Sequence, residues 1–169
     1  MFKMSFLQMR TNAALKKNTF LRGSTPYKLA QNIGIIFSVE DKQKHEDIKE
    51  FVRNLEQDGK KVRVLEFLPK KKDNFEFLYD FFTIENLTFW GRIDSQHAAR
   101  FSSTPFDYLF YIDRQSNPMI LNLLAQSKAK CRVGCFNELE SSFYELMIQY
   151  QGATKTLISN MYNYTKQLK

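Results

Sequence analysis

Apolar residues in the first half of the chain alternate between the spacing of strands and the spacing of a helix. Residues 32–38 (NIGIIFS) form a short apolar run rich in isoleucine, which is typical of a buried strand. Residues 44–60 predict a helix that ends at Gly59. Its apolar face consists of Ile48, Phe51, Val52 and Leu55. Residues 61–67 (KVRVLEF) then alternate like a second strand, and Pro69 ends it. The pattern predicts a β-α-β unit with parallel strands and a right-handed crossover.

The second half of the chain continues this alternation. Further strands are predicted at residues 87–91, 106–113 and 129–135. Further helices are predicted at residues 117–127, 137–150 and 152–169. The whole pattern predicts an α/β fold, a three-layer Rossmann-like sandwich with a mostly parallel five-stranded sheet. We expect the strand order 3-2-1-4-5, with strands numbered along the chain.

Residues 1–30 predict an additional basic, amphipathic helix. Its apolar positions, spaced by three or four, are Phe2, Phe6, Met9 and Ala13. Lys3, Arg10 and Lys17 recur every seven residues on an adjacent face. Such a helix could pack on its own domain with solvated lysines, lie on an anionic membrane surface, or bind RNA. The same acid-free pattern is also typical of a transit peptide.

The net charge of +7 is distributed unevenly along the chain. Residues 1–30 contain six basic residues and no acidic one, and residues 152–169 contain three basic residues and no acidic one. Residues 31–151 contain 16 basic and 18 acidic residues, a net charge of −2. We therefore expect a near-neutral α/β domain at 31–151 between a basic extension at 1–30 and a basic C-terminal helix packed on the domain at 152–169.

Composition narrows the class of protein further. The chain has 169 residues, two cysteines and many aromatic residues, which predicts one globular domain in a reducing compartment, most simply the cytoplasm. No apolar run approaches the roughly 20 residues of a transmembrane helix. The two histidines and two cysteines have no metal-ligand spacing, so we expect no metal.

The loop after the first strand argues against a nucleotide cofactor. Its sequence, SVEDKQKHED, has no glycine and places Glu40 and Asp41 at the start of the following helix. Those carboxylates would repel a pyrophosphate at the helix N-terminus. We therefore expect no cofactor.

The loop after the fourth strand, DRQSNP, has the richest set of polar residues for a ligand site. In an open parallel sheet it lies at the switch point, where ligands bind. Helix capping accounts for Ser116, Asn117 and Pro118, but not for the residues before them. The candidate catalytic residues are therefore Asp113, Arg114 and, from a neighbouring loop, His97.

Residues 106–134 (FDYLFYIDRQSNPMILNLLAQSKAKCRVG) resemble the last β-α-β unit in the N-terminal lobe of heptosyltransferase-like sugar transferases. In that unit a strand ends in Asp, here Asp113, and the next strand closes with a basic residue, an aliphatic residue and glycine, here Arg132, Val133 and Gly134. Those enzymes hold a nucleotide sugar in a second lobe, for which 169 residues leave no room. With NIGIIF before it and FYELMI after it, the stretch more closely resembles a small bacterial family of unknown function, over residues 32–148. This resemblance implies the fold and no activity.

The uneven charge predicts a non-catalytic binding module for an anionic macromolecule, RNA or a ribonucleoprotein ahead of an anionic membrane surface. The residues expected to contact phosphates are Lys3, Arg10, Lys16, Lys17 and Arg22. The alternative is a small-ligand-binding protein or an enzyme, resembling half of a sugar transferase, that uses the cleft near Asp113. A third interpretation is a subunit of a larger assembly with a protein partner, which predicts an apolar surface at residues 75–82.

Overall fold

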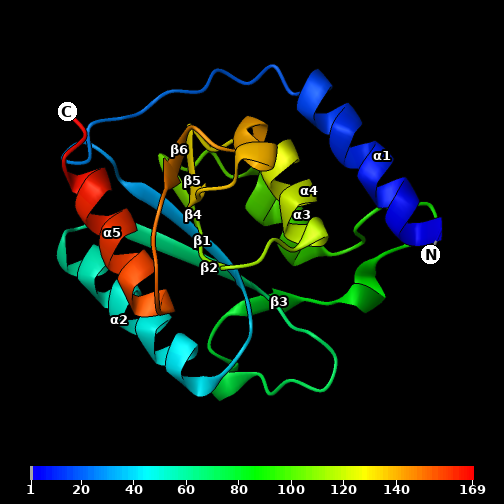
Figure 1. Cartoon of the computed structure of the whole chain (residues 1–169), viewed down its shortest axis with the longest axis horizontal. Coiled ribbons are helices and arrows are strands. Elements are labelled where there is room, and N and C mark those ends of the chain that lie inside the picture. The colour runs from blue at the N-terminus through cyan, green and yellow to red at the C-terminus, as the bar shows by residue number, and fades with distance from the viewer. Residues whose placement is uncertain (1) are drawn as a thin grey trace.

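The computed structural model describes residues 2–169, which form a six-stranded sheet with helices on both faces (Figure 1). The strand order is β3-β2-β1-β4-β5-β6, and neighbouring strands are parallel. The strands are β1 (Asn32–Ser38), β2 (Lys61–Phe67), β3 (Asp80–Phe82), β4 (Tyr108–Tyr111), β5 (Cys131–Cys135) and β6 (Leu146–Ile148). The helices are α1 (Phe2–Lys17), α2 (Lys42–Gln57), α3 (Gln96–Ser103), α4 (Pro118–Gln126) and α5 (Thr154–Lys166). The predicted Rossmann-like α/β class is confirmed, with one strand more than expected.

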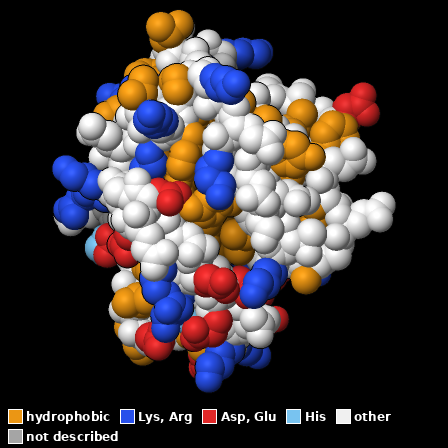
Figure 2. All heavy atoms as spheres, turned by 90° about the vertical axis from the view of Figure 1, so that its left-hand side faces the viewer, with side chains coloured by type: hydrophobic (Ala, Val, Ile, Leu, Met, Phe, Trp, Pro, Cys, Tyr) orange, Lys and Arg blue, Asp and Glu red, His pale blue; other side chains and the backbone are white. Residues whose placement is uncertain are grey.

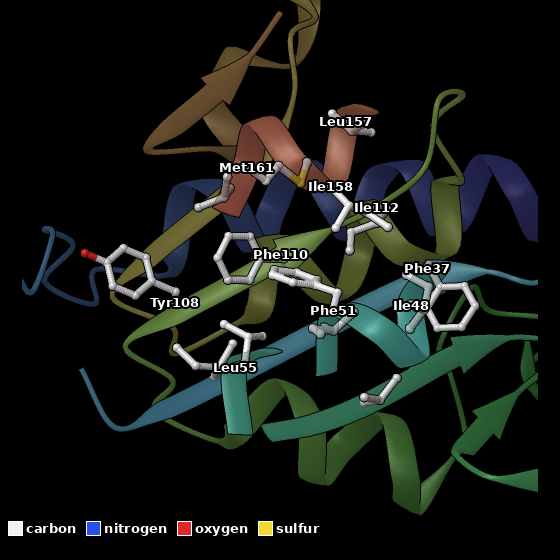
Figure 3. Packing of buried hydrophobic residues seen from close by; sticks show 14 of the residues in the cluster. Phe37, Ile48, Phe51, Leu55, Tyr108, Phe110, Ile112, Leu157, Ile158 and Met161 are labelled. Atoms are coloured by element: carbon white, nitrogen blue, oxygen red, sulfur yellow. The ribbon is translucent and has the colours of Figure 1, made fainter. Parts of the chain in front are cut away.

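Two hydrophobic cores lie on opposite faces of the sheet. On one face α2 and α5 cover the strands, and the ring of Phe51 from α2 packs edge-on against Phe110 of β4 at 5.2 Å (Figure 3). On the other face α1, α3 and α4 cover a second cluster, which includes Ile36 of β1. Because β1 is buried on both faces, its sequence is a continuous apolar run and does not alternate.

The third strand lies at β3, so its prediction at residues 87–91 is wrong. β3 has three residues, pairs with the end of β2, and leaves Phe81 partly exposed at the edge of the sheet. A strand of three residues is too short to show the alternation of apolar and polar residues that identifies a strand. Residues 87–91 instead belong to a tight turn that is closed by an antiparallel bridge between Leu87 and Ile93. Phe89 and Trp90 are on the surface and Leu87 is the only buried apolar side chain of this segment, which the sequence pattern did not reveal.

The predicted helix at residues 137–150 is also wrong. This segment forms a short 3-10 helix (Glu138–Phe143) followed by β6. Arg132 of β5 fixes it, because its guanidinium and its backbone N–H both donate to the Glu145 carboxylate, at 2.7–3.0 Å. This ion pair, together with the parallel pairing of β5 and β6, holds residues 145–148 extended beside the sheet.

α1 packs against α4 and the turn after Leu87 with a different face from the one predicted. Leu7, with 1% of its surface exposed, and Thr11 are buried, whereas Phe2 and Met9 are exposed. Gly91 allows this approach, because a Cβ there would collide with the backbone of α1. Apolar spacing alone predicted the wrong face, because the face of α1 that is buried is the one that fits closely against α4 and Gly91.

Candidate functional site

The carboxyl ends of β1 and β4 lie side by side at the centre of the sheet, and the chain leaves them toward opposite faces. α2 follows β1 onto one face, and α4 follows β4 onto the other. Asp113 lies at this switch point, as the sequence indicated. Its carboxylate accepts hydrogen bonds from the backbone N–H and the hydroxyl of Ser38, both at 2.8 Å.

A buried lysine neutralises Asp113. Lys44 Nζ lies 2.7 Å from Asp113 Oδ1, and the side chains of both residues are 3% exposed. The same ammonium donates to the Ser38 carbonyl oxygen at 2.8 Å. Burial raises the pKa of Asp113, and the Lys44 ammonium opposes that rise. Both carboxylate oxygens therefore have donors already, and the network joins β1, α2 and the loop after β4.

Sequence reasoning missed Lys44, although the sequence contains a signal for it. Lys44 precedes Ile48 by four residues and Phe51 by seven, so it lies on the buried stripe of α2. A lysine on an apolar stripe needs an acidic partner in the core. Asp113, at the end of a buried strand, is the acid that satisfies this requirement.

The structure does not bring the three candidate catalytic residues together. Arg114 is exposed beside a cavity of about 390 Å³ that Tyr111, Glu140 and Tyr144 also line. His97 lies on α3 and pairs with Asp80 of β3 at 3.4 Å. Because β3 and β4 are three strand spacings apart, about 14 Å lies between Asp80, the partner of His97, and β4, the strand that precedes Asp113. The polar loop therefore provides a cavity without an acid–base pair that includes His97.

One group of side chains in the described part of the chain has the spacing of metal ligands. His45, Glu46 and Glu76 each place one ligand atom within 4.8 Å of the others. Lys49 Nζ, however, lies 2.8 Å from Glu76 and 3.7 Å from Glu46. Hydrogen bonds from Lys49 and His45 lower the pKa of Glu76 to about 2. The Lys49 ammonium thus already pairs with both carboxylates, and we interpret the group as an ion-pair cluster.

The five N-terminal cations that the sequence singled out differ in their surroundings. Arg22 donates to the Ala129 carbonyl oxygen, and burial beside Arg132 lowers its pKa to about 10. Its guanidinium thus anchors the linker between α1 and β1. Lys3 and Arg10 donate to the carbonyl oxygens of Leu87 and Trp90, at 3.2 and 2.8 Å.

Lys16 and Lys17 are exposed near the end of α1. Lys3 and Arg10 are exposed as well, so of the five only Arg22 is partly buried.

A groove of about 370 Å³ lies between α1, the turn after Leu87, α3 and α4. Arg10, Lys17 and Arg92 supply the charges of its lining, which contains no acidic residue. The remaining polar lining comes from Ser102, Asn122 and Gln126. We call this feature the basic groove.

The face in Figure 2 is different. There, acidic and basic side chains lie next to one another over much of the lower half, around a hydrophobic hollow. The lining of the basic groove carries positive charge only, in contrast to this face, where both signs are mixed. Sequence reasoning did not assign Arg92 to this site, because the charge count placed it within the near-neutral middle of the chain.

Three aromatic rings cluster at the turn that supplies Gly91 and Arg92 to the basic groove. Phe6 of α1 lies 6.1 Å from Phe89 and 5.3 Å from Trp90 between ring centroids, and the latter two rings meet edge-on at 5.1 Å. Phe89 is 54% and Trp90 63% exposed. Trp90 is followed directly by Gly91 and Arg92, which line the groove. We call Phe6, Phe89 and Trp90 the aromatic tip.

A second exposed apolar surface lies in the loop before β3 and in β3 itself. Phe77, Leu78 and Phe81 are each partly or largely exposed, and Glu76 and Phe77 have positive φ angles of 59° and 46°. This is the segment where the sequence analysis expected an apolar surface in the case of a protein partner.

Among residues 2–169, no helix combines the length and hydropathy needed to cross a bilayer. Comparison with known proteins gave a match at the level of a family. No curated protein and no solved structure showed significant similarity to the chain. Residues 3–168, nearly the whole chain, match a family of unknown function. The match extends from α1 to the last turn after α5, so both basic ends are part of the family's domain. The chain belongs to this family, DUF6913.

Proposed function

We propose that this protein is a non-catalytic binding module for RNA or a ribonucleoprotein, and that the basic groove holds the phosphate backbone. The observation that carries the proposal is the lining of that groove, three cations and no acid. Phosphate contacts by arginine and lysine give affinity without sequence specificity, because bound counterions are released from the nucleic acid. The two free thiols, Cys131 and Cys135, suit a reducing compartment, and we place the module in the cytoplasm.

This proposal relocates the contact surface relative to the sequence analysis. Lys17 and Arg10 remain in it, Arg92 joins it, and Arg22 leaves it because its guanidinium is bonded within the fold. The cations act as one concave site that spans the first helix and the body of the domain. The whole domain is therefore the binding unit, and α1 is one wall of the site.

The proposal predicts how strongly the affinity for RNA depends on salt concentration. For a single strand the slope of log K against log salt is roughly −0.7 for each phosphate contact, so three contacts predict about −2. Affinity should then fall about 20-fold between about 50 and 200 mM salt. Fluorescence anisotropy with a labelled single-stranded RNA of about 12 nucleotides measures both quantities.

Charge reversal in the groove should remove most of this dependence. Lys17 and Arg92 have no hydrogen bond or ion pair from their side chains among the described residues, so Lys17→Glu/Arg92→Glu should fold normally. With Arg10 alone, the slope should fall to about −0.7. The matched control is Lys28→Glu/Arg53→Glu, which changes the net charge equally at two exposed positions away from the groove. Equal weakening by both pairs, or a slope near zero for the parent protein, would show that the groove is not the site.

A second candidate function is the binding of a small ligand at the switch point. The observation in its favour is the cavity of about 390 Å³ between Tyr111 and Tyr144, which lies where open parallel sheets bind ligands. Arg114 is the one exposed cation of that cavity. A ligand screen by thermal shift, repeated with Arg114→Ala, tests this function. A compound that stabilises the parent and not the variant would support it.

A further inference from the structure

The turn that presents Phe89 and Trp90 is held rigid at several points. Thr88 N–H donates to the Arg92 carbonyl oxygen at 2.8 Å, and Gly91 N–H donates to the Thr88 carbonyl oxygen at 3.0 Å. From α1, Arg10 Nε donates to the Trp90 carbonyl oxygen at 2.8 Å. The backbone that carries the two most exposed rings of the aromatic tip is therefore fixed, and both rings pack against Phe6. Rigid, exposed aromatic side chains lose little entropy on binding.

We propose that the aromatic tip is a stacking platform for the bases of a single strand, with Trp90 as its main ring. This inference rests on the proposed function and names its substrate class. A base on Trp90 would place its adjoining phosphate beside Arg92, two residues along the same turn, and beside Arg10, which is bonded to the Trp90 backbone. Aromatic rings next to a cationic groove are the combination that binds single strands without sequence preference.

The geometry favours a single strand over the other partners that an aromatic and basic surface can take. In a duplex the faces of the bases are stacked inside, so Trp90 could not reach them. An anionic membrane is flat and is bound by protruding side chains, whereas the three cations here line a groove of about 370 Å³. A strand of nucleotides fits both features, since its backbone lies in a groove while its bases turn outward to stack.

Trp90 is the single tryptophan of the chain, so its intrinsic fluorescence reports directly on the proposed contact. Oligouridylate of about 12 nucleotides should quench this emission on binding. An abasic oligomer of equal length and charge should bind more weakly, through phosphate contacts alone, and should leave the emission nearly unchanged. Both titrations use the full chain at low salt.

Variants separate stacking from charge. Trp90→Ala should weaken oligouridylate binding by about 5- to 150-fold in anisotropy, the range for loss of a stacked base, and should leave abasic binding unchanged. Trp90→Phe keeps a ring and should restore much of the affinity. Arg92→Glu should weaken both oligomers. Because the Trp90 ring is exposed and its ring contacts are with Phe6 and Phe89, circular dichroism melting should show that Trp90→Ala is folded.

The possible failures are distinguishable. If oligouridylate and the abasic oligomer bind equally and Trp90→Ala changes neither affinity, the stacking proposal is wrong and the basic groove keeps its function. If neither oligomer binds at low salt, the proposed function itself is wrong. If phosphatidylglycerol vesicles shift the Trp90 emission to the blue and neither oligomer binds, the tip is a membrane contact and both proposals are overturned.

Discussion

Replacing Lys44 by methionine should destabilise the fold strongly, because it leaves the Asp113 carboxylate buried without its counter-charge. Methionine keeps most of the length of the lysine stem and removes the ammonium that lies 2.7 Å from Asp113. The carboxylate keeps its two donors from Ser38, which supply hydrogen bonds and no positive charge. The variant therefore isolates the electrostatic contribution of one side chain.

The size of the effect follows from burial. With both side chains 3% exposed, breaking a buried pair by removing one partner costs about 3–5 kcal/mol. In a domain of this size that loss lowers Tm by about 6–20 °C. The cost depends on pH, because without Lys44 burial raises the pKa of Asp113 unopposed by an ammonium. The loss should therefore be complete at about pH 8 and should shrink as pH falls and the folded protein takes up a proton.

Urea unfolding followed by circular dichroism at about pH 8 and pH 5 measures the effect. The matched control is Lys49→Met, one turn further along the same helix, where the ammonium pairs with the half-exposed Glu76 carboxylate. Solvent screens that pair, so the control should change stability little at either pH. The double variant Lys44→Met/Asp113→Leu removes both charges and should be more stable than Lys44→Met alone, although Ser38 then loses its acceptor.

Equal stability losses in Lys44→Met and Lys49→Met would refute this reasoning. So would a loss in Lys44→Met that is the same at both pH values, because the argument requires a carboxylate that becomes neutral in acid. A double variant less stable than Lys44→Met would show that the donors of Ser38, and not the charge, dominate the site. Each of these results would mean that the ion pair with Lys44 does not explain why Asp113 is buried.

Two further predictions test the buried acid of β2 and the contact beneath α1. Glu66 is 1% exposed, and burial raises its pKa from 4.5 to about 7, a shift that corresponds to about 3 kcal/mol. The free energy of unfolding of the parent should therefore decline as pH rises through this window, and that of Glu66→Met should not. Urea unfolding at about pH 4 and pH 8 measures the difference. Gly91→Ala should cost more than about 2 kcal/mol in thermal melts, because φ is 72° and the added Cβ meets the backbone of α1; Gly59→Ala, with φ of 80° and open space around it, measures the backbone strain alone.

The sequence predicts the centre of this fold better than its edges. β1, β2, β4 and β5 have apolar or alternating runs, and their alternation with helices predicts that they are parallel, whereas their order was a guess that the structure agrees with. β3 and β6 have three residues each and lie at the two edges. Their extended conformation comes from pairing with one neighbour, a contact between distant residues that no local period records. The same limit explains why residues 137–150 were predicted as a helix.

The candidate site also depends on contacts between residues that are far apart in the sequence. Asp113 was predicted at the switch point because the sequence pattern shows where a buried strand ends. Its counter-charge comes from Lys44, which lies on a different element, α2. The basic groove combines Lys17 from α1 with Arg92 from a turn in the middle of the chain. A charge count along the sequence separates these two residues into different segments. Only the packing of α1 on α4 and on Gly91 unites them.

This packing decides how the binding proposals can be tested. Leu7 of α1 belongs to the same core as Phe106, Ile120 and Leu124, so removing the helix would expose that core to water. A truncated protein that fails to bind RNA would then have lost either its contacts or its fold. Lys17→Glu/Arg92→Glu and Trp90→Ala leave the helix in place, since none of these side chains is buried. Because α1 is a wall of the groove, substitutions within the intact chain, and not deletion of its basic end, carry the test.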